Sequence, residues 1–426
     1  MSTLTRLTNW IDDRFPLTQM WKEQWGEYIA PKNFNFWYYF GSLATLVLVI
    51  QIVSGIFLTM NYKPDAKLAF GSVEYIMRDV PWGWLIRYIH STGASAFFIV
   101  VYLHMFRGLM YGSYRKPREL LWIFGMFIYL CLMGEAFFGY LLPWGQMSFW
   151  GAQVIVNLFA AVPYIGPDLA LWIRGDYVVS DATLNRFFAF HVIALPLVLL
   201  GLVVAHLLAL HEVGSNNPDG IEIKKKKDPK TGIPLDGIPS HPYYTIKDLL
   251  GVSVFLIVFS AIIFFAPDMG GYFLEHNNFV PADPLKTPEH IAPVWYFTPY
   301  YAMLRAVPPL FGSQFPGVVV MGAAVVIFFF LPWLDRGKVK SIRYRGSLYK
   351  AWLAAFAVSF IILSICGLFP TNFMGQFGAT MPGVGGVEIA TVVARCFTVV
   401  YFAFFILMPW YTAMDKTKPE PERVTG

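Results

Sequence analysis

Eight long apolar segments constrain this chain more than any other feature. They lie at about 36–60, 84–111, 120–141, 183–211, 247–266, 314–334, 347–369 and 387–410. A helix needs roughly 20 apolar residues to cross a bilayer, and the segments meet that length. Hydrophobic residues form 56% of the 426-residue chain and charged residues only 14%, which excludes an ordinary soluble domain. The sequence therefore predicts an all-α membrane protein with eight transmembrane helices.

Lysine and arginine gather in alternate connections between these segments. The connection after the fourth segment carries Lys224, Lys225, Lys226, Lys227 and Lys230, and those after the second and sixth are also basic. The last connection on the other side has none. Because basic loops stay in the cytoplasm, these three loops and both termini are expected there. The lysine run is explained by this orientation, so neither a nucleic-acid partner nor a specific lipid site is expected.

Four histidines lie inside two of the segments. His90 and His104 are 14 residues apart, which is close to four helical turns and about 21 Å. His191 and His206 are 15 apart, and Pro196 between them could bend the helix and absorb the offset. Both segments run inward, which pairs His90 with His191 toward the outer face and His104 with His206 toward the cytoplasm. Two axial ligands per level suit haem iron, whereas zinc would lack two of its four ligands.

Glycines in the first and third segments repeat the 14-residue interval. Gly41 and Gly55 are one such pair, and Gly125 and Gly139 are the other. These segments run outward, so Gly41 and Gly125 fall at the cytoplasmic level and Gly55 and Gly139 at the outer level. Ordinary small-residue helix packing is the alternative explanation. The repeated interval favours two b-type haems, and without a C-x-x-C-H motif they would be bound non-covalently.

An arginine stands one turn from a histidine at each level. Arg87 precedes His90 by three residues, and Arg107 follows His104 by three. Guanidinium groups there could bind haem propionates through charge-assisted hydrogen bonds. Arginines that snorkel to the membrane surface are the simpler alternative.

These features resemble cytochrome b, the core subunit of ubiquinol–cytochrome c oxidoreductase. The likeness covers nearly the whole chain. It includes both histidine pairs and the stretches GSLATLVLVIQIVSGIFL, GYLLPWGQMSFWGA, HEVGSNNPDG and PVWYFTPYYAMLR. All eight segments are in one chain, unlike the split photosynthetic relatives, although the 15-residue histidine spacing resembles theirs. A bacterial inner-membrane protein is therefore expected.

The resemblance implies quinol oxidation near the outer face. One electron would pass to a mobile Rieske iron–sulfur protein and on to a membrane c-type cytochrome. The other would pass through an outer, low-potential haem and an inner, high-potential haem to reduce quinone near the cytoplasm, with ubiquinol and ubiquinone as substrates. A homodimeric, proton-translocating complex is implied as well. By motif position, the outer-site candidates are Tyr140, Gly151, Trp295, Tyr296 and Tyr301, and the inner-site candidates are Ser42, His211, Asn216, Lys247 and Asp248.

Two of the inner-site candidates are expected to act together. His211 ends the fourth segment, where a proton carrier would serve quinone reduction. Asp248 begins the fifth segment and is expected to pair with His211, although an acid at a helix N-terminus is also favourable by itself.

Five regions follow from these features. They are an amphipathic surface segment at 1–35, a di-haem four-helix bundle at 36–212, a cytoplasmic loop at 213–246, a C-terminal four-helix region with the outer quinol-site loop at 247–410, and a cytoplasmic tail at 411–426. The outer loops at 142–182 and 267–313 are long, aromatic and rich in Pro and Gly, with short helical patterns. Loops of this length are often functional. Amphipathic helices that merely cap the bundle are the alternative.

Two other classes of protein compete with this interpretation. A secondary transporter would need midplane charges and interrupted helices in repeat-related positions, and would not explain the histidine and glycine intervals. A di-haem anchor of a quinone-linked hydrogenase or dehydrogenase would explain those intervals, but would not need the long loop at 267–313.

One position departs from the family. Its usual outer-site motif is P-E-W-Y, whose glutamate is thought to bind quinol and carry a proton away, but Val294 stands there. Glu135 lies one turn before Gly139, about 9 Å from the outer end of its helix, where an ionisable group is costly and usually functional. We hypothesise that Glu135 replaces the motif acid, with Glu289 as the alternative. A buried, hydrogen-bonded neutral Glu135 and a merely solvated Glu289 are the simpler explanations.

Overall fold

The computed structural model describes residues 2–372 and 388–425, and its helices match the apolar segments. Within these residues, eight helical stretches are long and apolar enough to cross a membrane: Phe36–Thr59, Gly83–Tyr111, Glu119–Leu141, Asp181–Val213, Tyr243–Phe265, Phe315–Leu334, Ser347–Leu368 and Ile389–Ile406. The predicted all-α membrane fold is confirmed. Residue 387, where the last segment was expected to begin, lies outside the described residues.

Long helices form these spans, and shorter helices join them. The long ones are α3 (Tyr39–Thr59), α5 (Gly83–Tyr111), α6 (Glu119–Leu141), α9 (Asp181–Ala189) with α10 (Leu195–Val213), α11 (Tyr243–Phe265), α13 (Phe315–Val326) with α14 (Leu331–Leu334), α15 (Ser347–Leu368) and α16 (Ile389–Ile406). The shorter ones are α1 (Thr3–Asp12), α2 (Leu17–Trp21), α4 (Ala69–Arg78), α7 (Gln146–Ala160), α8 (Gly166–Arg174), α12 (Thr298–Ala306) and α17 (Met408–Met414).

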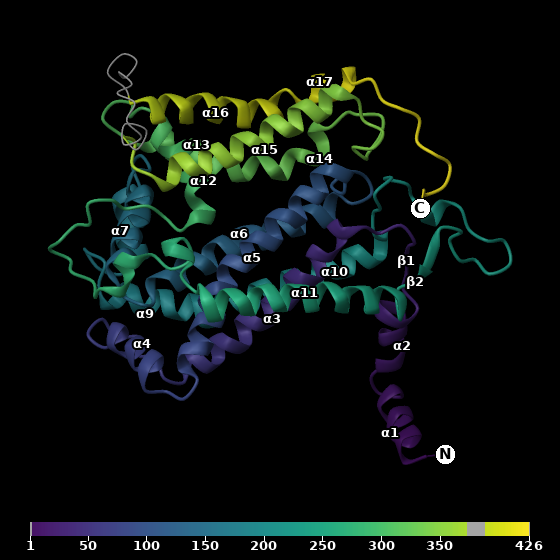
Figure 1. Ribbon diagram of the computed structural model, residues 1–426, viewed down its shortest axis with the longest axis horizontal. Coiled ribbons are helices and arrows are strands. Elements are labelled where there is room, and N and C mark those ends of the chain that lie inside the picture. The colour runs from purple at the N-terminus through teal and green to yellow at the C-terminus, as the bar shows by residue number, and fades with distance from the viewer. Residues whose placement is uncertain (1, 373–387, 426) are drawn as a thin grey trace.

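The long helices form two packed groups (Figure 1). In the first group α3 packs against α5, and α10 packs against α6. In the second group α12, α13, α15 and α16 pack together. Helix α11, which the sequence assigned to the C-terminal region, packs against α3 and α5. Both chain ends lie at one end of the molecule, called the terminal end below, and α4 and α7 lie at the opposite end, called the loop end (Figure 1).

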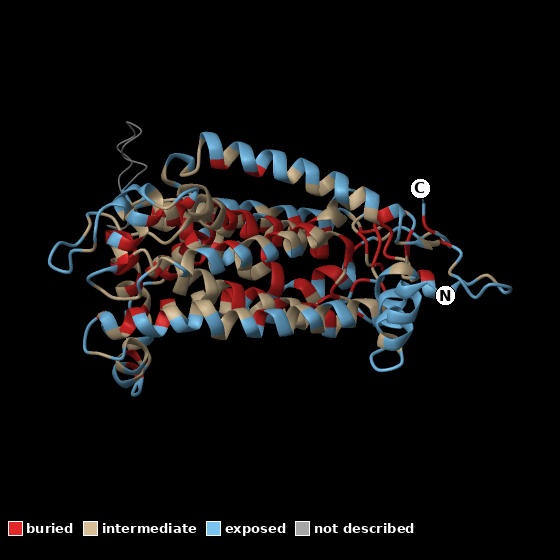
Figure 2. Cartoon of the chain, turned by 90° about the horizontal axis from the view of Figure 1, so that it is seen from below, coloured by how far each residue is buried: buried red, intermediate tan, exposed pale blue. Residues whose placement is uncertain are grey.

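The outward faces of the spans are apolar. Ile193, Leu197 and Val204 on one span are each more than half exposed. Buried residues lie between the helices, while exposed residues cover the outside (Figure 2). Such a surface would be costly in water, but it matches the hydrocarbon core of a bilayer.

A π-helical turn at Phe190–Ala194 joins α9 to α10 and contains His191. A π turn holds one residue more than an α turn, and such turns occur often at functional sites. The turn therefore absorbs the extra residue in the 15-residue spacing between His191 and His206. The sequence had assigned this role to a bend at Pro196, which lies just after the turn.

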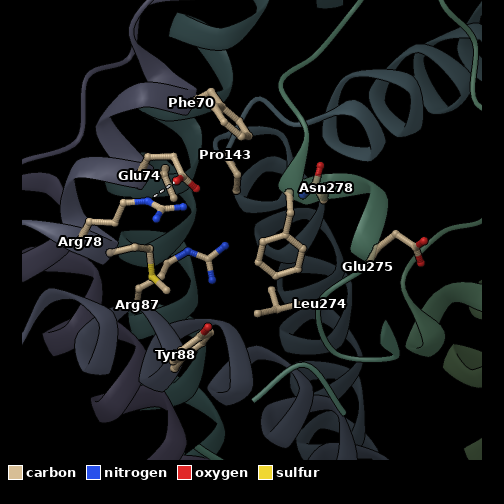
Figure 3. A pocket seen from close by; sticks show the side chains of 12 residues that line it. Phe70, Glu74, Arg78, Arg87, Tyr88, Pro143, Leu274, Glu275 and Asn278 are labelled. Atoms are coloured by element: carbon tan, nitrogen blue, oxygen red, sulfur yellow. Dashed lines mark hydrogen bonds and ion pairs between the residues drawn. The ribbon is translucent and has the colours of Figure 1, made fainter. Parts of the chain in front are cut away.

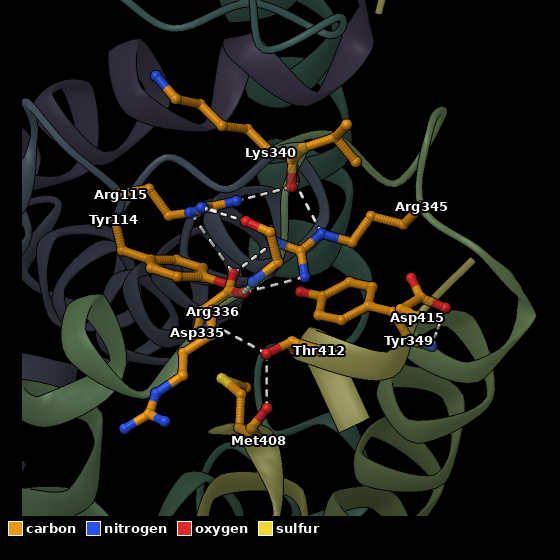
Figure 4. Close-up of polar contacts among 12 residues, drawn as sticks. Tyr114, Arg115, Asp335, Arg336, Lys340, Arg345, Tyr349, Met408, Thr412 and Asp415 are labelled. Atoms are coloured by element: carbon orange, nitrogen blue, oxygen red, sulfur yellow. Dashed lines mark hydrogen bonds and ion pairs between the residues drawn. The ribbon is translucent and has the colours of Figure 1, made fainter. Parts of the chain in front are cut away.

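A buried ion pair lies within the connection between α14 and α15 at the terminal end (Figure 4). The guanidinium of Arg345 makes a two-pronged contact with Asp335, and both side chains are at most 1% exposed. The Tyr114 hydroxyl donates a hydrogen bond to Asp335 at 2.7 Å. Burial by itself raises the pKa of Asp335, but the positive charge of Arg345 outweighs it and holds that pKa below its usual value. The ion pair braces this connection, and the Tyr114 hydrogen bond fixes the loop after α5 against it.

The N-terminal segment and the C-terminal tail meet over the same end. Strand β1 (Ile29–Pro31) pairs antiparallel with β2 (Gly237–Pro239). Asp236, just before β2, binds Lys32 at 3.0 Å and Arg423 of the tail at 2.9 Å. Burial raises the pKa of Asp236, but its hydrogen bonds with Arg423 and Lys32 prevail and lower it to about 2. Helices α1 and α2 have no buried residues and project from the bundle (Figure 1).

Candidate haem and quinone sites

The four histidines form two pairs inside the bundle, joined as the sequence predicts. The ring centres of His90 and His191 are 6.1 Å apart, and those of His104 and His206 are 6.4 Å apart. Ring centres this far apart leave room between the imidazoles for one metal ion bound to a nitrogen of each at about 2 Å. Helix α5 supplies one histidine to each pair and the α9–α10 span supplies the other.

Each predicted glycine lies against the histidine expected at its level. A Cβ atom at Gly41, Gly55 or Gly125 would come within 3.2–3.3 Å of a ring carbon of His104, His90 or His206, respectively. A Cβ at Gly139 would overlap His191, only 2.9 Å from Nδ1 and 3.0 Å from Nε2. Side chains at these four positions would therefore displace the histidines.

Both arginines have unpaired buried nitrogens. Nη1 of Arg87 and Nε of Arg107 are buried without a hydrogen-bond partner among the described residues. Burying a guanidinium N–H without an acceptor is costly, so these groups suit an anionic ligand. Paired imidazoles, glycines that leave room beside them and one such cation per level together fit haem with its propionates.

Four of the inner-site candidates make three separate contacts near the terminal end. The hydroxyl of Ser42 donates to Asp248 at 2.9 Å, and Lys247 lies over the Tyr243 ring at 4.9 Å. His211 Nδ1 instead lies 2.5 Å from Gln24 Oε1. The direct pairing of Asp248 with His211 that the sequence suggested is not among the contacts of the described residues.

The fifth inner-site candidate, Asn216, is engaged in a hydrogen bond that holds two parts of the chain together. Its side chain is buried, and its amide donates to the backbone oxygen of Tyr111 at 2.8 Å, at the end of α5. It therefore holds the loop after α10 against α5. Its Oδ1 atom is the only part left without a partner within the described chain.

Four outer-site candidates lie in two clusters, one where α6 meets α7 at the loop end and one against the middle of α5. A Cβ at Gly151 of α7 would lie 3.8 Å from the Tyr140 ring, so α7 packs directly on the end of α6. Trp295 and Tyr296 both contact α5. The indole of Trp295 donates to Ser95 at 3.1 Å, and the Tyr296 ring stacks on another ring of α5 with centroids 3.9 Å apart. The fifth candidate, Tyr301, donates to a backbone oxygen ten residues earlier at 3.3 Å.

The two long loops are fastened to each other beside these clusters. Asn278 accepts a hydrogen bond from the Ser148 backbone at 2.8 Å and returns one to the Ser148 hydroxyl at 2.9 Å. The Ser148 hydroxyl in turn donates to the Tyr140 carbonyl at 2.5 Å. The sequence did not single out Ser148 or Asn278, because neither shows a periodic or charge pattern.

A cavity of about 300 Å³ adjoins this junction (Figure 3). Arg87 and Arg78 point into it, and Arg78 pairs with Glu74 at 2.7 Å. The wall formed by the 267–313 loop includes Glu275, whose carboxylate points away from Arg87 (Figure 3). Apart from Arg87, sequence reasoning missed these charged residues, because they come from three separate segments.

The two candidate acids differ in their surroundings. Oε1 of Glu135 lies 3.0 Å from His191 Nδ1, and its Oε2 is buried without a partner among the described residues. Glu289 is exposed, with no hydrogen bond or ion pair in the described chain. Val294 is half-buried against the core and offers no proton acceptor.

Eight spans and two histidine pairs at different depths define an integral membrane protein with two candidate haem sites. The chain belongs to the cytochrome b family: residues 26–214 match the family described as Cytochrome b/b6/petB, and residues 281–402 match Cytochrome b(C-terminal)/b6/petD. This membership implies haem binding and a redox role as part of a larger complex, and it excludes the transporter alternative.

Individual relatives match over almost the full length. The chain is 64% identical to a cytochrome b of Allochromatium vinosum, with 99% of each chain covered. It is 45% identical to a cytochrome b of Rhodospirillum rubrum, with 98% of this chain and 95% of the relative covered. A solved hyperthermophilic respiratory complex III matches with a TM-score of 0.80 at 40% identity, covering 95% of this chain and 98% of that one.

Proposed function

We propose that this chain is the core subunit of a quinol:cytochrome c oxidoreductase in a bacterial inner membrane. Quinol is oxidised near the loop end, which faces outward, and quinone is reduced near the terminal end, which faces the cytoplasm. One electron leaves through a Rieske iron–sulfur protein to a membrane c-type cytochrome. The other crosses the membrane between the two histidine pairs, so turnover contributes to the proton gradient.

The observation that carries this proposal is the pair of bis-histidine sites on shared helices. When bound there, b-type haems supply reversible one-electron chemistry at two depths. His90 and His191 would hold the outer group, and His104 and His206 would hold the inner one. Arg87 and Arg107 would neutralise the propionates, and the glycines would leave room for the macrocycles.

The outer quinol site is assigned to aromatic side chains, and the inner quinone site to polar side chains near the terminal end. At the outer site the aromatic side chains of Tyr140, Trp295 and Tyr296 bind the quinol ring and exclude water. At the inner site Asp248 and His211, which contact different partners, can engage opposite sides of one quinone and deliver its protons.

Ligand variants test the proposal most directly. His90→Leu or His191→Leu should remove the outer haem alone, and His104→Leu or His206→Leu the inner haem alone. Reduced-minus-oxidised spectra of the purified complex report which haem remains. The pairing is wrong if a single change within either pair leaves both haems with normal spectra.

The reaction class needs its own measurement. The intact complex should reduce cytochrome c with quinol as the electron donor, and outer-site inhibitors should block this reaction. A complex with both haems but no quinol-dependent reduction of cytochrome c would favour the di-haem anchor alternative instead.

A further inference from the structure

The two histidine pairs differ in what their Nδ1 atoms contact. In the outer pair, His191 Nδ1 lies 2.9 Å from the Glu135 carbonyl and 3.0 Å from its carboxyl Oε1. His90 Nδ1 lies 2.9 Å from the Ser54 hydroxyl. That hydroxyl donates its own proton to Ile50 O at 2.6 Å, so a lone pair is left to accept from His90. His90 therefore has a side-chain hydroxyl as its acceptor, while His191 donates to the Glu135 carbonyl and has the carboxyl of the same residue close beside its Nδ1.

The inner pair has no such acceptors. His104 Nδ1 lies 3.2 Å from Nη2 of Arg107, which is a cation and a donor. His206 Nδ1 has no hydrogen-bond partner within the described residues, and it is buried. In the described chain, no acidic side chain pairs with either inner histidine. The carboxyl group is thus confined to one level of the bundle.

This difference has a direct electronic consequence. A histidine that binds iron through one nitrogen donates the N–H of the other, and a stronger acceptor makes the imidazole a more electron-rich ligand. An electron-rich ligand stabilises the ferric state more than the ferrous state, which lowers the reduction potential. The effect is larger in the low-dielectric interior than it would be in water.

We propose that Glu135, assisted by Ser54, lowers the reduction potential of the outer haem below that of the inner haem. Glu135 acts through His191 and is therefore a positioning residue for the ligand. With haems bound, this difference would favour inward transfer of one electron, with the outer iron oxidised from ferrous to ferric as the inner iron is reduced from ferric to ferrous. The proposal rests on the proposed function, and it adds a physical reason why electrons would pass from the outer haem to the inner haem.

Redox titration of the purified complex, followed at the two haem absorption bands, tests this. Glu135→Leu removes the carboxyl beside His191 Nδ1 but keeps the backbone carbonyl, and we expect the ratio of reduced to oxidised outer haem at a fixed potential to rise about tenfold, a shift of about 59 mV. Glu135→Gln keeps an amide oxygen and should give a smaller shift. Ser54→Ala should shift the same haem in the same direction. The inner haem should not move in any of these variants.

Asp168→Asn is the matched control. It removes one negative charge from α8, an exposed helix at the same end, without touching a ligand. An unchanged outer potential in Glu135→Leu and Ser54→Ala, with both haems present, would overturn the proposal. An equal shift of both haems would also overturn it, because that is a general charge effect. If Glu135→Leu loses the outer haem, Glu135→Gln and Ser54→Ala decide the outcome. Failure of the proposed function itself would appear separately, as missing b-type bands in the unmodified complex.

Discussion

Gly139→Val is the sharpest test of the haem geometry. A Cβ at this position would overlap Cε1 of His191 and lie 2.9 Å from Nδ1, whereas non-bonded carbons prefer about 3.5–4.0 Å. Valine adds two further methyl groups to that Cβ. The histidine must therefore move by roughly an ångström, more than at the other three glycines, where a Cβ would come within 3.2–3.3 Å.

The energetic size of this effect can be bounded. Overpacking of a well-filled site typically costs about 1–3 kcal/mol. If that cost falls on haem binding, affinity for the outer haem drops by roughly 5- to 150-fold, since 1.4 kcal/mol is a factor of ten. The inner haem should be unaffected, because Gly139 lies at the level of His90 and His191 only.

The assay is the reduced-minus-oxidised spectrum at two poised potentials, which separates the two haems. Gly201→Val is the matched control, because a Cβ at Gly201 of α10 meets no atom within 4 Å and the intrinsic helix penalty of valine is the same. We expect loss or a spectral shift of the outer haem in Gly139→Val alone. A normal outer haem, or an effect confined to the inner haem, would refute the assignment of levels.

Two further perturbations probe the acid at the quinol site and the terminal end. Glu135→Gln should slow quinol oxidation strongly while both haems remain, and adding Val294→Glu should restore part of the rate. Normal turnover in Glu135→Gln together with slow turnover in Glu289→Gln would assign the role of proton acceptor to Glu289. Asp335→Asn should lower the free energy of unfolding by about 3–5 kcal/mol, because Arg345 is left buried without its counter-charge. Thermal unfolding measures this loss, and adding Arg345→Met should recover part of it. An unchanged melting temperature would contradict the reasoning. Since the folded-state pKa of Asp335 is lowered, this stabilisation is present above the unfolded pKa of about 3.9 and declines as the pH falls below it.

Some of the quinone-site predictions could not be completed from the sequence. Motif position identified Asp248 and His211, but not that Asp248 contacts Ser42 while His211 contacts Gln24. The cavity beside Arg87 combines residues of α4, α5 and the 267–313 loop. Residues so far apart in the chain leave no local pattern, so only the folded chain brings them together.

The sequence by itself determined the spans and the pairing of the histidines. Hydropathy and a 14-residue interval are local properties, and the alternating direction of successive spans then fixes which histidines share a depth. Only the tertiary structure decided that a π turn at His191 corrects the 15-residue spacing, and that Glu135 turns its carboxyl toward that ligand. These features depend on the rotation of each helix and on side-chain rotamers, which neighbouring helices set and a one-dimensional pattern does not encode.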